Sequence, residues 1–256
     1  MARNARFILS FFVLMFSGLS YGQTEPVVVT ATRTAQTVDA SLAAVNVIDR
    51  EEIEALQPVT VSDILRTVPG VFVSNSGGLG QPSAVFLRGS ESDHVLVLID
   101  GVKVGSTTLG STSFQFLDPD QIERIEVVRG PRSSLYGPDA IGGVIQIFTR
   151  DPDKAPRASA FATGGTDDYS KFGARLSAGG NATKFSIGAN YEKSTGYDVC
   201  KGSTTAGCFT FEDDLDGYEN LSVQAKLAGS LNEQTDFSVS YLSSTGETEY
   251  DGSFSN

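Results

Sequence analysis

The feature that most constrains this 256-residue chain is a strict alternation of apolar with polar or small residues after residue 157. Because successive side chains of a β-strand point to opposite faces, such alternation predicts strands with one apolar and one polar face. The apolar series are Phe172, Ala174, Leu176 and Ala178; Phe185, Ile187, Ala189 and Tyr191; Leu221, Val223, Ala225 and Leu227; and Phe237, Val239 and Tyr241.

Segments of about ten alternating residues joined by turn residues are typical of outer-membrane β-barrels. A soluble antiparallel sheet with one face in water produces the same alternation, so the pattern alone leaves both readings open. In either case we expect five strands in an antiparallel meander, at about 157–163, 169–178, 183–194, 218–228 and 236–243, with a short turn at 229–235 after the fourth.

The N-terminus carries an export signal. Arg3 and Arg6 precede an apolar stretch over 7–16, and small residues surround a cleavage position after Gly22. This pattern predicts a secretory signal peptide over 1–22, and export favours the barrel reading of the strands. Exported proteins meet an oxidising compartment, in which Cys200 and Cys208 can pair.

Composition argues against two classes of function. The net charge of -12 disfavours a nucleic-acid partner, because phosphate binding needs a basic face. The chain has a single histidine, His94, and shows no nucleophile–base pair or zinc-ligand set, so we do not expect an enzyme. We assign His94 no role.

Residues 36–150 have a mixed pattern. Asp49 can cap a short helix over 50–56, and a second helix fits 62–67 before Pro69 and Gly70. A buried strand is expected at 95–99, and further strands are expected at 122–128, which alternates weakly, and 144–148. Short helices mixed with strands predict an α+β domain with a small mixed sheet.

Several motifs in this region carry a family resemblance. They are VSDILRTVPGV at 61–71, FLRG at 86–89, VLIDGV at 97–102 and the long stretch at 122–145 that contains RGPRSSLYG. These motifs resemble the plug domain of TonB-dependent outer-membrane receptors, and within that family the chain is most similar to cobalamin receptors. The resemblance implies an α+β plug domain followed by the antiparallel strands that begin a transmembrane β-barrel.

The function that the resemblance implies is TonB-dependent transport of cobalamin, or a related metal chelate, through the bacterial cell outer membrane into the periplasm. The implied partners are the TonB protein, the chelate and outer-membrane lipid. A ferric siderophore or haem receptor is an alternative, and so is a truncated plug-like binding module without transport.

The resemblance also divides the chain. It implies a signal peptide at 1–22, a TonB-box segment at 23–35, a plug domain at 36–150 and an incomplete set of barrel strands at 151–256. A complete barrel of this family has about 22 strands, so we expect an N-terminal fragment.

The TonB box is the segment expected to contact the energy-transducing partner. An extended peptide offers its backbone to the edge of a partner's sheet, which requires no catalytic group. An ordinary first strand of the plug is the alternative. The residues are Glu25, Pro26, Val27, Val28, Val29, Thr30 and Ala31.

Two further sets of residues follow from the resemblance. Substrate contacts are implied at the plug apex, near the glycine-rich loop 76–82, for which a simple surface loop is the alternative. The substrate set is Pro82, Ala84, Glu91, Leu109 and Gly110. Arg88 and Arg129 match arginines that hold the plug by pairing with glutamates of the barrel wall.

The loop at 195–217 is rich in carboxylates and resembles the calcium-binding loop of cobalamin receptors. Carboxylate oxygens are the ligands that Ca²⁺ takes in proteins, although a solvated acidic loop would have the same composition. The implied ligands are Asp198, Glu212, Asp214, Asp216, Tyr250 and Asp251, and counting strands places all of them on the outer side. A bridge between Cys200 and Cys208 would restrict this loop before metal binds.

Overall fold

The structure, a computed structural model, describes residues 28–29, 36–37, 44–106, 110–201, 214–232 and 234–250. The predicted signal peptide lies outside the described residues. Of the TonB box, only β1 (Val28–Val29) is described, and its backbone pairs antiparallel with β2 (Gln36–Thr37). No described helix is long and apolar enough to cross a membrane.

The plug, taken here as residues 44–150, is built on a five-stranded mixed sheet of order β3-β8-β9-β6-β7. Strands β6 and β9 are parallel and the other neighbours are antiparallel. The bounds are β3 (Ala44–Ile48), β6 (Val95–Ile99), β7 (Val102–Val104), β8 (Ile122–Arg129) and β9 (Gly143–Thr149), with a separate hairpin of β4 (Val71–Asn75) and β5 (Ser83–Leu87). The three predicted strands are confirmed to within one residue.

Both predicted helices are present because their caps are encoded locally. Helix α1 (Arg50–Leu56) is capped by Asp49, whose carboxylate accepts from the backbone N–H of Glu52 at 2.9 Å. Helix α2 (Val61–Arg66) begins one residue earlier than predicted, because Thr60 and Asp63 form a reciprocal capping box. The other helical turns of the described residues are α3 (Ser133–Tyr136), η2 (Ser92–His94), η3 (Phe114–Phe116) and η4 (Pro119–Gln121).

One apolar core joins the plug sheet to its helices. Ile53 of α1 and Leu65 of α2 pack with sheet residues such as Ile125 and Ile145, and all four are at most 1% exposed. Burial of this kind is the main stabilising term in an ordinary water-soluble domain. The plug therefore follows the usual rule of apolar inside and polar outside.

The predicted meander is present, and consecutive strands are antiparallel neighbours in the order β10-β11-β12-β13-β14. The strands are β10 (Arg157–Gly164), β11 (Ser170–Gly179), β12 (Thr183–Ser194), β13 (Tyr218–Asn232) and β14 (Thr235–Thr248). The predicted turn at 229–235 is wrong. The ladder continues to Asn232 and Thr235, because Asn232 Oδ1 accepts from Gln234 N at 2.9 Å and closes a tighter turn.

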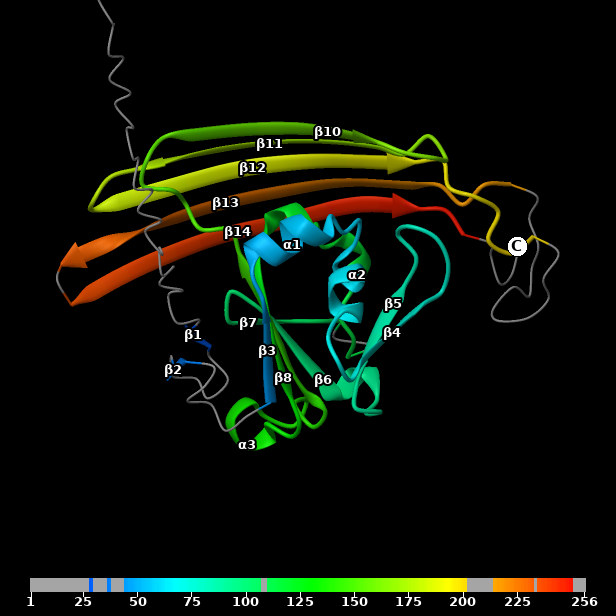
Figure 1. Cartoon of the computed structure of the whole chain (residues 1–256), viewed down its shortest axis with the longest axis horizontal. Helices are drawn as coiled ribbons and strands as arrows, with labels where there is room; N and C mark the ends of the chain where they lie inside the picture. The colour runs from blue at the N-terminus through cyan, green and yellow to red at the C-terminus, as the bar shows by residue number, and fades with distance from the viewer. Residues whose placement is uncertain are drawn as a thin grey trace, which may run out of the picture.

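The meander curves over the plug, which lies beneath its concave side (Figure 1). Its polar face is the covered one, and its apolar face points away from the plug. Phe172, Ile187 and Val239 are 53%, 50% and 62% exposed, whereas Asn220 and Ser222 are 3% and 1% exposed. This is the arrangement expected of barrel strands whose outer face meets lipid rather than water.

Candidate functional site

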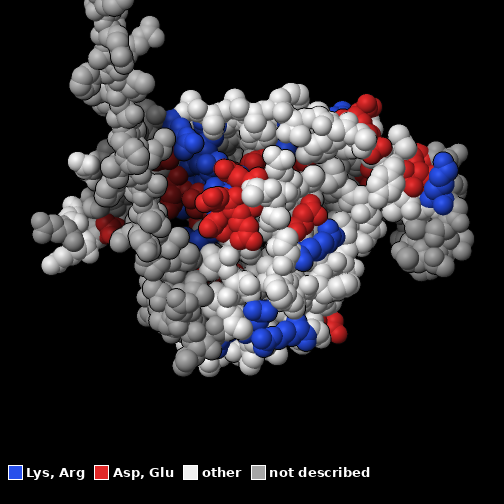
Figure 2. Space-filling view, in the orientation of Figure 1, with Lys and Arg blue, Asp and Glu red and all other residues white. Residues whose placement is uncertain are grey.

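The interface between the plug and the inner face of the meander holds the charged groups of greatest interest. Figure 2 shows basic and acidic side chains side by side beneath the meander, next to α1. Side chains on the inner face of the meander contact plug residues in η3, in η4 and at the end of β9. Each contact joins elements that are far apart in the sequence.

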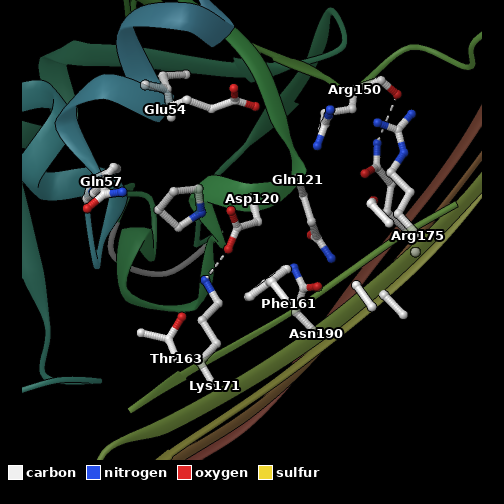
Figure 3. Close-up of a pocket in the computed structure, with 18 of the residues that line it drawn as sticks. Glu54, Gln57, Asp120, Gln121, Arg150, Phe161, Thr163, Lys171, Arg175 and Asn190 are labelled. Carbon is white, nitrogen blue, oxygen red and sulfur yellow. Dashed lines mark hydrogen bonds and ion pairs between the residues drawn. The ribbon is translucent and has the colours of Figure 1, made fainter. Parts of the chain in front are cut away.

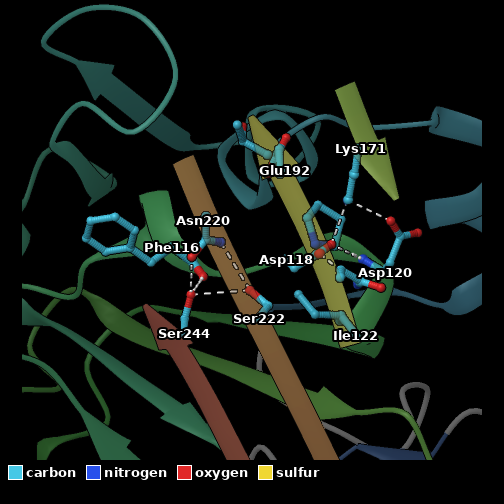
Figure 4. Close-up of polar contacts among 12 residues, drawn as sticks. Phe116, Asp118, Asp120, Ile122, Lys171, Glu192, Asn220, Ser222 and Ser244 are labelled. Carbon is cyan, nitrogen blue, oxygen red and sulfur yellow. Dashed lines mark hydrogen bonds and ion pairs between the residues drawn. The ribbon is translucent and has the colours of Figure 1, made fainter. Parts of the chain in front are cut away.

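The most deeply buried contact joins η4 to β11 and β12 (Figure 4). Lys171 Nζ lies 2.8 Å from Asp118 Oδ1 and 2.7 Å from Asp120 Oδ2. Asn190 Nδ2 donates to the other oxygen of Asp118 at 2.7 Å. Buried charges are stable only when they are paired and hydrogen-bonded, and Asp118 satisfies both conditions.

A neighbouring hydrogen bond joins Tyr169 to Glu192 of β12. The Tyr169 hydroxyl donates to Glu192 Oε1 at 2.7 Å. Burial, followed by this bond and the nearby carboxylates, raises the pKa of Tyr169 above its usual range. The hydroxyl helps to satisfy the hydrogen-bonding capacity of the buried Glu192 carboxylate, which is 6% exposed.

Serine and asparagine side chains of β13 and β14 hold η3 (Figure 4). Ser244 Oγ lies 2.7 Å from the carbonyl oxygen of Phe116 and 2.8 Å from Asn220 Oδ1. Tyr218 donates its hydroxyl to the carbonyl oxygen of Gln115 at 3.2 Å. These bonds attach the plug backbone directly to the strands.

A second ionic contact lies at the end of β9. Lys226 Nζ of β13 is 2.8 Å from Asp151 Oδ1 and 3.7 Å from Asp100 Oδ1. Asp100 has a left-handed backbone (φ 47°), and its carboxylate accepts from Thr149 N at 2.9 Å. Asp100, which belongs to the motif at 97–102, therefore joins the end of β6 to β9 and faces Lys226 of the meander.

The glycine-rich apex loop, residues 76–82, packs against the start of β13 and the end of β14. Ser76 N donates to the carbonyl oxygen of Pro82 at 3.1 Å, which closes the loop, and Gln81 Nε2 donates to Glu249 O at 2.9 Å. Gly80 has φ +77°, and a Cβ there would lie 2.2 Å from Tyr218 Cδ2, so only glycine fits. The apex thus lies at the end of the meander from which the loop at 195–217 extends.

The implied substrate residues lie on adjoining segments of the plug. Ala84 of β5 lines a small cleft together with Ser92 and Ser111, which neighbour the predicted residues Glu91 and Gly110. Pro82, Glu91 and Gly110 are exposed, and Leu109 lies outside the described residues. The structure brings these segments together, and their contact with a substrate stays a prediction.

Arg88 and Arg129 lie next to each other around Gly70. A Cβ added at Gly70 would be 3.9 Å from atoms of both side chains. Arg129 donates to the carbonyl oxygen of Pro69 at 2.8 Å, while its Nε is buried without a hydrogen-bond partner. Neither arginine is ion-paired to a carboxylate of the described residues, so their glutamate partners stay a prediction.

Asp216, one of the predicted calcium ligands, contacts the residues on either side of another, Asp198: Val199 N donates to Asp216 Oδ2 at 2.8 Å. Asp216 N donates to Tyr197 O at 3.4 Å, and a Cβ on Gly196 (φ +66°) would lie 1.8 Å from Asp216 O. Asp198 follows Tyr197 in the chain, and both of its carboxylate oxygens are buried without a hydrogen-bond partner. Asp214 and Tyr250 are exposed, and Glu212 and Asp251 lie outside the described residues.

A cavity lies between α1 and the inner faces of β10 to β13 (Figure 3). Its volume is about 600 Å³, and its walls carry both signs of charge. The charged lining residues are Arg50, Glu54, Asp120, Arg150, Lys171 and Arg175.

Sequence reasoning did not single out Asp118 or Asp120. Alternation does place Lys171, Asn190 and Glu192 on the polar face, but it does not show which plug segment meets them. The Asp-Pro-Asp sequence at 118–120 is a local signal, because an aspartate before proline is a frequent cap of a short turn, as it is in η4.

Comparison with known proteins decides the family. A family model described as TonB-dependent Receptor Plug Domain matches residues 37–144. The chain is 38% identical over 228 residues to the vitamin B12 transporter BtuB of Photobacterium profundum, covering 89% of this chain and 36% of the relative. This chain belongs to the TonB-dependent receptor family.

Other relatives agree. The vitamin B12 transporter BtuB of Vibrio vulnificus is 39% identical over 232 residues, which cover 90% of this chain and 37% of that protein. The chain therefore spans somewhat more than a third of the length of the curated relatives it matches.

Solved structures support the same fold. The siderophore receptor PirA from Acinetobacter baumannii superposes with a TM-score of 0.66 at 26% identity, covering 84% of this chain and 33% of that chain. Pseudomonas aeruginosa FpvA bound to a heterologous pyoverdine gives a TM-score of 0.71 at 19% identity, covering 89% and 29%.

These findings confirm the family resemblance, the predicted fold class and the predicted location in the outer membrane. The family is one of receptors and transporters rather than enzymes. The domain bounds, the individual site residues and the calcium ion stay predictions.

Proposed function

We propose that the full-length protein imports cobalamin, or a closely related metal chelate, through the outer membrane with energy supplied by TonB. The supporting observation is the identity of 38–39%, over 89–90% of this chain, with proteins named vitamin B12 transporters. In this proposal the chain supplies the plug and the first strands of the wall. The polar interface described above holds the plug in place.

Uptake and surface binding by the full-length receptor test this function. The receptor is produced in a strain that lacks its own cobalamin receptor, and binding and uptake of radiolabelled cobalamin are measured separately. We expect saturable binding and energy-dependent uptake. The second candidate is a ferric siderophore, which the similarity to PirA favours. Absence of cobalamin binding, with saturable binding of a siderophore or haem, would replace the first proposal with this one.

The TonB box acts, in this proposal, by adding a strand to the partner. Strand addition uses backbone N–H and C=O groups, and proline removes the donor. Val28→Pro should abolish uptake and leave surface binding intact. Normal uptake by this variant would mean that the segment is an ordinary strand of the plug.

A calcium ion bound by the acidic loop is part of the proposal. Buried carboxylates are normally paired, so the two unpartnered oxygens of Asp198 fit a hard cation that takes oxygen ligands. Asp198, Glu212, Asp214, Asp216, Tyr250 and Asp251 would hold the ion, which would order the loop beside the apex. Within the part of the chain that the structure describes, no group of three or more candidate ligands is complete.

Metal removal tests the calcium proposal. Excess chelator should weaken cobalamin binding by the wild type, because a preordered loop loses less entropy on binding. Asp214→Ala combined with Asp216→Ala should remove this calcium dependence. Equal affinity with chelator and with calcium would identify a solvated acidic loop.

The same loop carries the two cysteines. Cys200 is disulfide-bonded in the structure, and the only other cysteine of the sequence, Cys208, lies outside the described residues. The proposed Cys200–Cys208 bridge would close a short loop between the first calcium ligand and the others, which restricts the unbound loop. Non-reducing peptide mapping of the full-length receptor tests the pairing.

A further inference from the structure

The cavity between α1 and the inner faces of β10 to β13 contains cations of two kinds (Figure 3). Two are neutralised by carboxylates. Lys171 Nζ contacts Asp118 and Asp120, and Arg50 Nε donates to Glu54 Oε1 at 2.8 Å. Arg150 and Arg175 have no carboxylate at such short distances within the described residues.

Arg150 and Arg175 are paired less closely with carboxylates than Lys171 and Arg50 are. Arg150 Nε is buried without a hydrogen-bond partner, and the Glu123 carboxylate is 3.9 Å away. Arg175 donates to the carbonyl oxygen of Asp151 at 2.7 Å, and it forms no ion pair within the described part of the chain. Burial and the nearby Arg50 charge lower the pKa of Arg150, although an arginine remains charged. Two guanidinium groups without a carboxylate at short distance favour the binding of an anion between them.

A third donor points into the same cavity. Gln121 is only 7% exposed, and its Nε2 is buried without a hydrogen-bond acceptor. Arg150 N donates to the carbonyl oxygen of Gln121 at 2.9 Å, so the two side chains start from adjacent backbone. Figure 3 shows the Gln121 amide extending between Arg150 and Asn190 toward Phe161. A buried amide donor without an acceptor costs free energy unless something occupies the site.

An aromatic ring borders these donors. Phe161 is an inward-facing residue of β10, since its neighbours Ser159 and Thr163 pair with the inward residues Arg175 and Lys171. The ring lies over Gly173, where a Cβ would come within 2.3 Å of it. Phe161 is still 38% exposed, so the cavity offers an apolar surface beside two guanidinium groups.

We propose that Arg150, Arg175 and Gln121 form a binding site for an oxyanion, a phosphate or carboxylate group, on the plug–wall interface. Guanidinium groups with a neutral N–H donor match the oxygens of such a group, and charge-assisted hydrogen bonds are the stronger kind. The group comes either from a chelate passing between plug and wall, which rests on the proposed function, or from free phosphate.

A cysteine reporter in the full-length receptor tests the site without transport. Ser159→Cys places a thiol opposite Arg175 in the β10–β11 ladder. Its rates of modification by an anionic and a cationic methanethiosulfonate reagent of similar size are compared. We expect the anionic reagent to react faster, on the order of tenfold at low ionic strength. Inorganic phosphate should slow the anionic reagent in a saturable way.

Variants identify the groups responsible. Arg175→Gln in the reporter background should bring the two rates close together and remove the effect of phosphate. Lys184→Gln is the matched control, because Lys184 lies on the inner face of β12 outside this cavity, and it should leave both effects intact. Equal rates, an unreactive thiol or a lack of protection by phosphate in the reporter protein would each overturn the proposal.

Transport distinguishes the source of the oxyanion. If the chelate supplies it, Arg175→Gln should slow uptake of a chelate that bears a phosphate or carboxylate group several-fold, while surface binding is unchanged. If free phosphate is the occupant, uptake is unchanged and phosphate protection persists in the reporter protein. Failure of cobalamin uptake in the wild type would refute the proposed function. The reporter experiment would still decide whether the oxyanion site exists, because it does not depend on transport.

Discussion

In the plug, Ile125 and Ile145 are fully buried, whereas on the meander Ile187 is half exposed and its neighbour Ser186 is buried. Both regions contain β-sheets with isoleucine and valine side chains. They differ in what surrounds them. The plug sheet hides apolar groups from water, and the meander presents apolar groups to lipid and polar groups to the plug.

The comparison also separates two kinds of stabilisation. The plug relies on apolar burial between its sheet and helices. The interface with the meander relies on hydrogen bonds and ion pairs, such as those of Lys171 with Asp118 and Asp120. Polar contacts of this kind depend on the pairing of each group, so a single substitution can weaken the interface without changing the core.

The largest effect is expected at the buried ion pair. Lys171→Met leaves the Asp118 carboxylate buried without its cation and should weaken plug docking by about 3–5 kcal/mol. The measurement is the urea concentration at which the plug of the full-length receptor becomes protease-sensitive. Asp118→Asn added to Lys171→Met should recover part of the loss, because it removes the uncompensated charge.

Lys103→Met is the matched control for that experiment. Lys103 and Asp139 form an ion pair at 2.6 Å, but both are exposed, so the loss should be below about 1 kcal/mol. Equal effects at the two lysines would mean that the interface is hydrated and loose.

The core of the plug should respond nearly as strongly. Ile145→Ala removes buried methyl groups and leaves a cavity, which costs about 2–5 kcal/mol of plug stability. Ile141→Ala, at a position that is 48% exposed, is the control and should change stability little. The two variants are compared by chemical denaturation of the full-length receptor.

A charged residue on the outer face of the meander should be destabilising. Ile187→Arg places a cation where we expect lipid, and the free energy of folding into vesicles should become less favourable by about 2–4 kcal/mol. Leu56→Arg is the control, since Leu56 is similarly exposed on α1 of the plug and should tolerate the change within about 0.5 kcal/mol. A tolerated arginine at 187 would contradict the lipid-facing assignment.

The smallest effect is expected at a helix cap. Thr60→Ala removes the side-chain bond of the capping box of α2 and should destabilise the plug by about 1 kcal/mol. Ser113→Ala is the control, because Ser113 precedes η3 without a capping bond. The difference between them is read from the same denaturation curves.

Local signals explain which elements the sequence predicts. Helix α1 has the predicted bounds because Asp49 sets its start, and β12 matches the prediction because its alternation runs unbroken from Phe185 to Glu192. Strands β3, β4, β5 and β7 were missed because each has only three to five residues, too few to show a period, and none is wholly apolar as the five residues of β6 are.

The site was harder to predict for a different reason. Alternation shows that Lys171 and Asn190 share the polar face, but their partner Asp118 lies 53 and 72 residues away in the sequence. The unpartnered groups of Gln121 and Arg150 depend on burial, which has no local sequence pattern. The resemblance located the apex loop and the acidic loop, because each of them is a contiguous stretch of sequence that can be recognised without its contacts.

The central claim is that the meander has its apolar face in lipid and its polar face on the plug. Spin labels placed one at a time along 185–190 of the full-length receptor in vesicles test it directly. Accessibility to oxygen should peak at 185, 187 and 189 and fall at 186, 188 and 190, with the opposite pattern for a water-soluble nickel reagent excluded from lipid. Oxygen accessibility without this two-residue period, or with the phase reversed, would contradict the account.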